Sequence, residues 1–448
     1  MRFSNFPSFK SHSIYRHIGI TIGLSLATGF LHSAIVPKAL AGQDLETSQY
    51  LSQIVINDNE RAAFKKSGAK PSGQEIIAPG QPEAPAEVGK KHNIAVLPQL
   101  GYDPTSGFII GGKLADNNFS SSNLNMDLGA TYATSGDASF DLSFGDPNLF
   151  GGHQWIGLIK FTKDLSPGSD FYGLGNNSTG GTTLATYNLH RTKANFTLGY
   201  RLAPHWVAAL DIGFDKISIG KGSPSGNTPS ALTRFPNLPG LHGNYNNPVA
   251  LSLIYNTQRD LTRPTHGWNN IVKIQHVGPE LGNSVNYTRY LADFKYTLPV
   301  FSSKNILGFR LDGEYVDGSG NNLPFYEMAS IGGSNNLEGF KSDRFLGQSR
   351  VFAQIGYRRL LADFDFYNIW RVRIDGALFG GAGRVFLNRS KLPHNLSRAA
   401  TPDLSSKFRY SYGTGVRIDL GEALTARIDI GFSKNNKAQA FLEFGNRF

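Results

Sequence analysis

Few residues of this chain stand at the spacings that catalysis or metal binding requires. The histidines beyond the N-terminal region are scattered over predicted loops, turns and strand ends, at His92, His153, His190, His205, His242, His266, His276 and His394. Neither an HExxH pair nor a GxSxG nucleophile motif accompanies them. The chain has no cysteine, which excludes disulfides and thiolate metal sites. We therefore predict a protein that is not an enzyme and that holds no cofactor or metal.

A glycine-rich segment, which reads IGGSNNLEGF from Ile331 to Phe340, is the most distinctive remaining candidate for a functional site. A glycine loop that cradles phosphate needs a strand before it and a helix after it. Here the segments on both sides alternate apolar and polar residues, as strands do. Gly332, Gly333 and Gly339 are therefore predicted to serve backbone geometry. We expect the segment to fold back into the lumen of a β-barrel.

The charged residues that could surround such a loop stand at every second position of short runs. In one run Trp370, Val372 and Ile374 share a face, whereas Arg371 and Arg373 share the other. Sixteen such runs begin at Asn93, an even number, as single-chain bacterial barrels require. They span approximately residues 93–103, 107–117, 124–134, 138–146, 153–163, 184–202, 205–219, 248–259, 267–277, 286–300, 303–316, 349–362, 367–386, 407–420, 424–433 and 437–448.

The same alternation would suit a soluble β-sandwich with one wet face, but three features favour a membrane barrel. The polar faces carry both signs of charge, as a lumen of paired ions would, and the apolar faces end in Trp and Tyr. The long connections, 164–183, 220–247, 317–348 and 387–406, all fall on one side, which fits periplasmic termini. The last run puts Leu442 and Phe444 on one face and ends at Phe448, like the C-terminal signature of outer-membrane barrels. The sequence thus predicts an all-β fold, a 16-stranded antiparallel transmembrane barrel whose lumen receives the loop after strand eleven.

The N-terminal region divides into two parts before the barrel. Basic residues precede an apolar run at 18–30, and Ala39-Leu40-Ala41 fits a cleavage site, so residues 1–41 are predicted to be a secretory signal peptide. The alternative is a membrane anchor, for which the run is short. Residues 42–92 are rich in Gln, Glu, Lys, Pro, Ala and Gly and are predicted to be a disordered or weakly helical periplasmic segment. Within it Leu45, Tyr50, Leu51 and Ile54 have a roughly helical spacing. Residues 93–448 are assigned to the barrel.

Several motifs in sequence order resemble one family. They are PQLGYDPTSG at Pro98–Gly107, FYGLGN at Phe171–Asn176, QRDLTRPTHG at Gln258–Gly267, the IGGSNNLEGF segment and the ending FLEFGNRF. Together they resemble the bacterial surface antigen family, the BamA/TamA-like outer-membrane barrels. The resemblance implies a sixteen-stranded barrel that inserts outer-membrane proteins or exports polypeptides, with unfolded polypeptides as clients. Members that assemble barrels usually carry periplasmic POTRA modules, which residues 42–92 are too short and too rich in proline to build.

The chain departs from the family at the loop motif. The family pattern is like Val-Arg-Gly-Phe, and here it reads Leu337-Glu338-Gly339-Phe340. The family's acidic partners of that arginine correspond to Gly356 on strand twelve and Gly381 on strand thirteen. A buried charge needs a partner, so we expect Glu338 to pair with Arg358, Arg371 or Arg373. The alternative is that Glu338 is a solvated loop residue.

Two further features concern the ends of the strands. Arg259, Asp260, Pro264 and Gly267 are predicted to form a defined periplasmic turn. The first strand, near 93–102, and the last, near 438–448, would meet in a weak seam, and strands that part there could offer backbone groups to a client strand.

The formal net charge of +10 raises the question of an anionic partner. In an outer membrane that partner would be lipopolysaccharide, or an acidic solute at the pore mouth, rather than nucleic acid. Arg389, Lys391, Arg398 and Lys407 of one long loop are the candidate contacts for lipopolysaccharide, and ordinary solubility is the alternative explanation of these charges. Protein assembly or translocation is the leading interpretation. The alternative is a substrate-conducting channel or a structural surface barrel without client-assembly activity.

Overall fold

A computed structural model of the chain describes residues 47–48, 50–52, 54–55, 94–119, 124–176, 182–222, 228–259, 263–366, 370–401, 407–420, 424–434 and 436–444. The predicted signal peptide, most of residues 42–92, Asp260 and Phe448 lie outside these ranges. None of the helices within them is long and apolar enough to cross a membrane.

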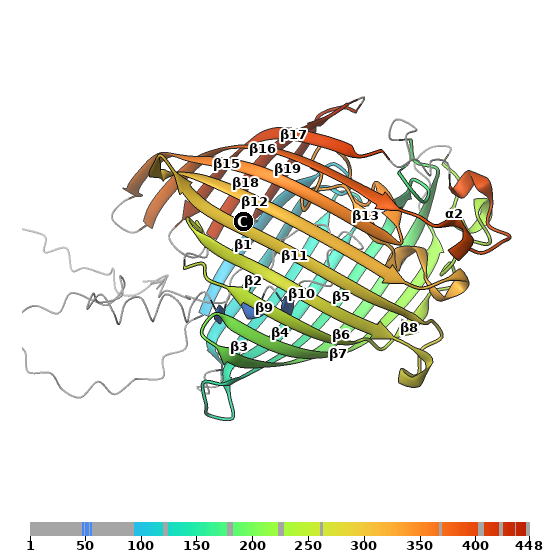
Figure 1. The fold of residues 1–448 in the computed structure, drawn as a ribbon, viewed down its shortest axis with the longest axis horizontal. Coiled ribbons are helices and arrows are strands. Elements are labelled where there is room, and N and C mark those ends of the chain that lie inside the picture. Colours follow the sequence, from blue (N-terminus) through green and yellow to red (C-terminus); the bar gives the residue numbers. More distant parts are fainter. Residues whose placement is uncertain are drawn as a thin grey trace, which may run out of the picture.

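Sixteen antiparallel strands form a closed barrel, since β1 pairs both with β2 and with the last strand, β19 (Figure 1). Each corresponds to one of the sixteen predicted runs, which confirms the predicted fold class. They are β1 (Ile94–Asp103), β2 (Gly107–Phe119), β3 (Leu124–Ala133), β4 (Ala138–Leu149), β5 (Trp155–Phe171), β6 (Ala185–Ala203), β7 (Trp206–Lys221), β9 (Val249–Asn256), β10 (Gly267–Val277), β11 (Tyr287–Val300), β12 (Ser302–Asp317), β15 (Ser349–Phe366), β16 (Trp370–Phe386), β17 (Arg409–Leu420), β18 (Leu424–Ser433) and β19 (Gln439–Phe444).

Strand β5 is longer than its predicted run, which stopped at residue 163. Its pairing with β6 continues to Phe171 through a register shift between Ser166 and Ser169. A bulge at this shift accommodates Pro167 and Gly168, which interrupt the apolar alternation without ending the ladder. The connection predicted at 164–183 is therefore shorter and starts after Phe171.

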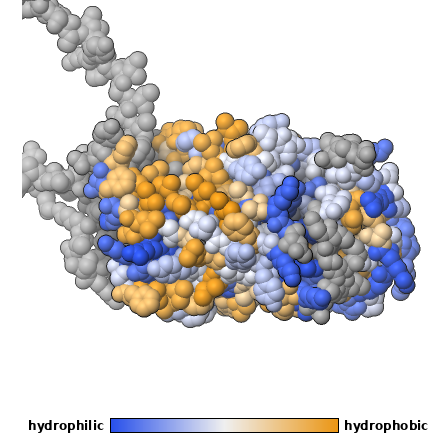
Figure 2. Space-filling view, turned by 90° about the horizontal axis from the view of Figure 1, so that it is seen from above, coloured by the Kyte–Doolittle hydropathy of each residue, from blue (hydrophilic) through white to orange (hydrophobic). Residues whose placement is uncertain are grey.

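The faces of the strands follow the predicted alternation. On β11, Tyr290 and Phe294 are exposed on the outside, whereas Arg289 and Asp293 are buried in the lumen. Figure 2 shows apolar side chains gathered in a band on the barrel, while hydrophilic residues cover the end with the long loops. An apolar outer band around a polar lumen is the pattern of a barrel in a lipid bilayer.

Aromatic pairs join neighbouring strands at the end that carries the short connections, which we call the turn end. Trp155 packs on Tyr200, Trp206 on Tyr255 and Trp268 on Tyr296, with ring centroids 4.3–4.7 Å apart. The six residues come from the neighbouring strands β5, β6, β7, β9, β10 and β11. They form an aromatic girdle of the kind found at a bilayer interface.

At the opposite end, which we call the loop end, the long connections fold over the mouth of the barrel. Their regular elements are α2 (Ala231–Arg234), β8 (Asn244–Asn246), η2 (Pro279–Leu281), η3 (Gly320–Asn322), η4 (Phe325–Glu327), β13 (Ala329–Ile331), β14 (Phe345–Gly347), η5 (Arg389–Lys391) and η6 (Arg398–Ala400). One apolar cluster joins residues from several of these connections and from nearby strand ends, including Phe171, Phe235, Tyr287, Phe325 and Leu396. The loops thus form a packed dome rather than separate surface loops (Figure 1).

Candidate functional site

The loop after strand eleven, here β12, lies inside the barrel near the loop end. After Asp317 it makes the short hairpin β13–β14, in which Ile331 pairs with Phe345, and it rejoins the wall at Ser349. Leu337 and Phe340 at its tip are buried in one cluster with Phe352 and Val385 of the wall. The IGGSNNLEGF segment is therefore packed against the lumen side of the barrel rather than exposed at the mouth.

Two glycines and an asparagine set the shape of the tip. Gly332 and Gly333 have φ angles of 123° and 99°, values that favour glycine, and a Cβ on Gly332 would overlap the carbonyl of Lys341. Asn336 Oδ1 accepts hydrogen bonds from the backbone N–H of Gly332, at 2.6 Å, and of Leu337, at 2.9 Å. The Gly333 N–H donates to the Phe340 carbonyl at 3.0 Å. These bonds make the tip a compact turn.

The tip meets β18 backbone to backbone. A Cβ on Gly339 would stand 2.5 Å from the Phe432 carbonyl oxygen, and a Cβ on Gly431 would overlap the carbonyl of Glu338. Ser433 Oγ donates to the Gly339 carbonyl at 2.7 Å. Gly339 is thus required for close approach to the wall, and its partner Gly431 gave no signal in the sequence beyond being a glycine within a strand.

Glu338 is buried, and its carboxylate accepts a hydrogen bond from Gln354 Nε2 at 3.2 Å. The structure therefore excludes a solvated position for Glu338. Arg371 is exposed and pairs with Asp363, Arg373 lies 3.7 Å from Asp419, and Arg358 donates to the Pro264 carbonyl at 3.1 Å. The pairing of Glu338 with one of these arginines stays a prediction, whereas Gln354 is a partner that sequence reasoning missed.

Ion pairs with residues of the barrel wall hold the loop in place. Glu327 on η4 accepts from Arg191 of β6 at 2.8 Å and from Arg289 of β11 at 3.0 Å. Burial would raise the pKa of Glu327, but the two guanidinium groups outweigh burial and lower it. Arg191 also pairs with Asp215. Glu327 was missed in the sequence because its partners come from strands that are distant along the chain.

The network continues around the lumen through alternating charges. Its contacts run from Arg289 to Glu314 (3.4 Å), Glu314 to Arg350 (3.0 Å), Arg350 to Asp312 (3.1 Å), Asp312 to Arg310 (3.5 Å) and Arg310 to Asp293 (2.8 Å). Arg310 and Arg350 also donate to the loop carbonyls of Asn335, at 2.6 Å, and Ser330, at 2.9 Å. Buried ions are stable only as a complete paired set, so the wall and the loop form one polar unit.

The turn end of the lumen contains the helical residues 47–48, 50–52 and 54–55, called the lumenal helix below. Leu51, Ile54 and Val55 pack on inward apolar residues of β5, β7, β9, β10 and β11, which are Ile156, Val207, Ala209, Ile254, Ile271 and Leu291. Ser52 Oγ donates to Asn269 Oδ1 at 2.9 Å and accepts from Asn256 Nδ2 at 2.6 Å. The spacing of Tyr50, Leu51 and Ile54 indicated a helix, but its position within the lumen differs from the expected periplasmic location. The signal in the sequence that could have indicated a partner inside the lumen was an apolar residue on the otherwise polar face of several strands.

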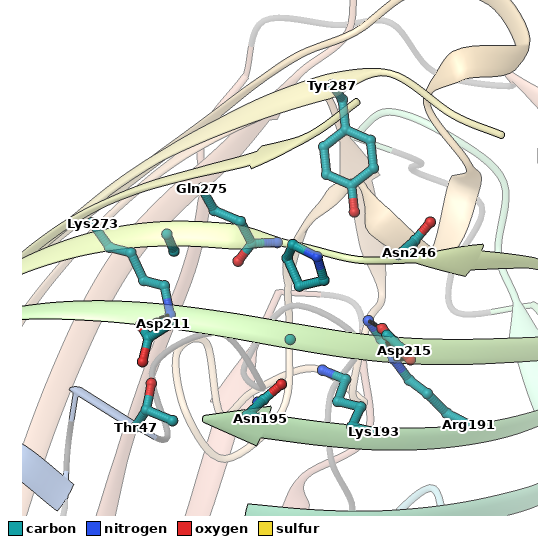
Figure 3. A pocket seen from close by; sticks show the side chains of 13 residues that line it. Thr47, Arg191, Lys193, Asn195, Asp211, Asp215, Asn246, Lys273, Gln275 and Tyr287 are labelled. Carbon is teal, nitrogen blue, oxygen red and sulfur yellow. Dashed lines mark hydrogen bonds and ion pairs between the residues drawn. The ribbon is translucent and has the colours of Figure 1, made fainter. Parts of the chain in front are cut away.

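A polar cavity lies beside the lumenal helix. It has a volume of about 40 Å³ and is lined by wall side chains and by Thr47 (Figure 3). Lys273 pairs with Asp211 at 3.1 Å, and Arg191 with Asp215, on opposite sides of this cavity. Such a volume holds a few waters.

The structure describes Arg259, Pro264 and Gly267 of the predicted periplasmic turn. Gly267 has a φ of 114°, and a Cβ there would stand 2.8 Å from Thr257 Oγ1. The turn inserts Arg263, which sequence reasoning did not single out, into the lumen, where its Nε donates to Asp375 Oδ2 at 2.8 Å. Together with the bond from Arg358 to Pro264, this contact anchors the turn to the wall.

The seam between the first and last strands closes the barrel. All ten residues of β1 pair with β2, whereas Tyr102 opposite Leu442 is the one pair between β1 and β19 among the described residues. Leu442 and Phe444 lie on the outer face of β19, while Phe441 and Glu443 are buried in the lumen.

The chain was compared with known families and structures. Residues 118–448 match the family described as the Omp85 superfamily domain. A comparison with curated proteins finds none that matches. The crystal structure of BamA from Haemophilus ducreyi lacking POTRA domains 1–3 has a TM-score of 0.58 at 16% identity, over 79% of this chain and 70% of that chain. CdiB from Escherichia coli has a TM-score of 0.53 at 14% identity, over 89% of this chain and 70% of that chain.

These similarities agree with the closed antiparallel β-barrel. The family match covers most of the chain, from β2 to the C-terminus. The protein belongs to the Omp85 superfamily and is an outer-membrane β-barrel.

Proposed function

We propose that this barrel assembles outer-membrane proteins or translocates polypeptides, and that its clients are unfolded polypeptide segments. The observation that supports the proposal is a barrel whose first and last strands meet at a seam, while the loop and the lumenal helix occupy its lumen. A barrel with an occupied lumen is suited to act at the seam between its first and last strands. A parted β1 or β19 would present unpaired N–H and C=O groups, and a client strand could pair with them.

In this proposal the loop end faces the cell exterior and the turn end faces the periplasm. A client would reach the turn end, where the lumenal helix lies. Among its described residues, the helix packs through Tyr50, Leu51, Ile54 and Val55, and Ser48 and Ser52 hydrogen-bond to the wall. Release of these contacts would open the inward apolar residues around Ile254 to an amphipathic segment of a client.

The test is depletion of the protein, followed by quantification of the other outer-membrane proteins. A loss of many barrel proteins would support assembly. A loss of one secreted or surface-exposed polypeptide, with the other barrels intact, would support translocation. An unchanged profile of both would reject the proposal.

The second candidate is a solute channel, and the residual cavity favours it. The cavity is lined by three cations, Arg191, Lys193 and Lys273, and two anions, Asp211 and Asp215, which is a hydrated polar lining. If the lumenal helix and the loop were displaced, this lining would conduct ions. Planar-bilayer conductance with and without residues 331–345 tests this candidate, since a channel should conduct more when the constriction is removed.

Contact with lipopolysaccharide is a separate proposal for the dome. Of the four cations of the loop after β16, Lys391 pairs with Asp317 at 3.0 Å and Arg389 donates to Thr401 at 2.9 Å. Arg398 and Lys407 are then the better candidates for a phosphate of lipid A. Replacing these two by Gln should weaken retention in native outer membrane, and unchanged retention would contradict the contact.

A further inference from the structure

The dome contains a second cavity, which is larger than the one beside the lumenal helix. Its volume is about 340 Å³, within the range of roughly 300–1,000 Å³ that is usual for sites that bind small molecules. Its described lining residues come from four connections between strands of the barrel. They are residues 236–244 after β7, Ser284 and Val285 after β10, Asn321 and Pro324 after β12, and Asn395 after β16.

The floor of this dome cavity is apolar. Leu238, Leu241 and Val285 line it and belong to the buried cluster of the dome. Pro324 is buried as well, and a Cβ on Gly240 would stand 2.7 Å from Pro324 Cβ. The connections after β7 and β12 are therefore in close contact at the floor, and the tight packing fixes its shape.

Hydrogen bonds between the connections hold the walls of the dome cavity in place. The Phe325 N–H donates to the Pro239 carbonyl at 3.0 Å, which joins the connection after β12 to the one after β7. Asn237 Nδ2 donates to the Asn395 carbonyl at 3.1 Å and so joins the connection after β16. A cavity cross-linked in this way is preformed, as small-molecule sites usually are.

The rim of the dome cavity is polar but carries no fixed charge. Lysine, arginine, aspartate and glutamate are all absent from the described residues that line it. His242, Ser284, Asn321 and Asn395 are exposed there, and within the described part of the chain their side chains form no hydrogen bond or ion pair. Hydroxyl, amide and imidazole groups can both donate and accept hydrogen bonds, so the rim offers both functions to a ligand.

An apolar floor beneath an uncharged polar rim restricts the chemical class of the ligand. A charged ligand would lose water without gaining an opposite charge. A wholly apolar ligand would cover the rim groups and leave them without partners, at a cost of about 1–3 kcal/mol for each buried group. A saccharide has a face of ring C–H groups and an edge of hydroxyls that both donate and accept, so it matches the floor and the rim together.

We propose that the dome cavity binds a neutral saccharide, with the C–H face of a sugar ring on the floor and its hydroxyls bonded to Ser284, Asn321 and Asn395. In the orientation proposed above, the dome faces the cell exterior, where neutral sugars occur free or within lipopolysaccharide. Binding needs no client and involves no residue of β1 or β19. The inference therefore goes beyond the proposed function and does not depend on it.

The experiment measures saturation-transfer NMR with the full chain, folded in detergent. The neutral probes are glucose, galactose, mannose and N-acetylglucosamine, and glucuronate is the charged probe. Asn321→Ala removes one rim group, and Ser284→Trp fills the cavity. Asn322→Ala and Asn286→Trp are the matched controls, since both residues are exposed close neighbours that do not line the cavity. The heat-dependent mobility shift shows that each variant is folded.

We expect saturation transfer to the ring protons of at least one neutral sugar and none to glucuronate. Asn321→Ala should raise the Kd about fivefold, as expected for the loss of one hydrogen bond. Ser284→Trp should abolish binding, and the two controls should leave the Kd unchanged. Absence of transfer to every neutral probe overturns the proposal, as does binding that survives Ser284→Trp or glucuronate binding as tight as that of the sugars. If Ser284→Trp does not fold, an unchanged Kd in Asn321→Ala overturns it.

Competition with lipopolysaccharide identifies the source of the sugar. Lipopolysaccharide with its full carbohydrate chain, or lipid A without neutral sugars, is added to the protein with its bound sugar. Displacement by the full form alone assigns the cavity to the surface glycan, and displacement by neither assigns it to a free saccharide. Displacement by both would show that the lipid part binds and would overturn the saccharide assignment. An intact outer-membrane protein profile after depletion would reject the proposed function and leave sugar binding unaffected.

Discussion

Gly339 of the lumenal loop and Gly431 of β18 lie so close that neither position has room for a Cβ. They are 92 residues apart in the sequence, and the contact joins the loop to β18, the strand before the last one. Because glycine at both positions lets two backbones touch, this contact holds the loop tip directly against the wall. This contact and the ion-pair network around Glu327 can each be tested by substitution.

Replacing Gly431 by Val should release the loop tip while the barrel stays folded. The added side chain would overlap the Glu338 carbonyl, and overpacking of this kind typically costs about 1–3 kcal/mol. Limited proteolysis at Lys341 and Arg344 should become several-fold faster, with the heat-dependent mobility shift of the barrel preserved. Gly380→Ala is the matched control, since its nearest atom would be 3.9 Å away, and equal protection in both variants would contradict the prediction.

Replacing Glu327 by Gln should destabilise the loop without breaking the strand ladders. Arg191 and Arg289 would lose a shared anion, although Asp215 and Glu314 would still neutralise them in part. We expect the free energy of unfolding to fall by about 2–3 kcal/mol, which is less than the full penalty of an isolated buried charge. The decrease in the temperature at which the barrel unfolds in detergent measures this loss of stability. Glu280→Gln removes an exposed carboxylate of another dome loop and should leave that temperature unchanged.

The Glu327 network also predicts a response to acid. The pKa of Glu327 is lowered in the folded protein by Arg191 and Arg289, which outweigh its burial. A group with a lowered folded pKa stabilises the fold above its unfolded pKa, about 4.3, and this contribution is lost as pH falls through the lowered value. Loop protection against an acid-active protease should therefore persist at pH 5 and decline only below about pH 4. Glu327→Gln should flatten this dependence, and a decline already complete at pH 5 would be inconsistent with it.

Disrupting the lumenal helix should open the turn end of the barrel. Leu51 is buried against inward residues of the wall, and Leu51→Glu would place an unpaired charge there, at a cost of several kcal/mol. We expect dissociation of the helix and a measurable rise in single-channel conductance in planar bilayers. Ser48→Ala removes one 3.3 Å hydrogen bond and should behave like the unaltered protein. No difference between the two variants would show that the helix does not limit conduction.

The strands and their orientation could be predicted because they depend on local sequence. An alternation such as Arg289, Tyr290, Asp293 and Phe294 fixes which side chains face lipid and which face the lumen, since neighbouring strand residues point in opposite directions. The alternation of long and short connections indicated the two ends of the barrel in the same way. The bulge at Ser166–Ser169 interrupted the pattern, which is why the end of β5 was placed too early.

The contacts inside the lumen were decided by tertiary structure, because they join residues that are distant along the chain. Nothing near Leu51 in the sequence specifies Ile254 as its neighbour, and nothing near Glu327 specifies Arg191. The sequence by itself determined a sixteen-stranded barrel with a polar lumen and a glycine-rich loop after strand eleven. Only closure of the sheet decided what fills that lumen, because it brings β1 and β18 within reach of the same loop.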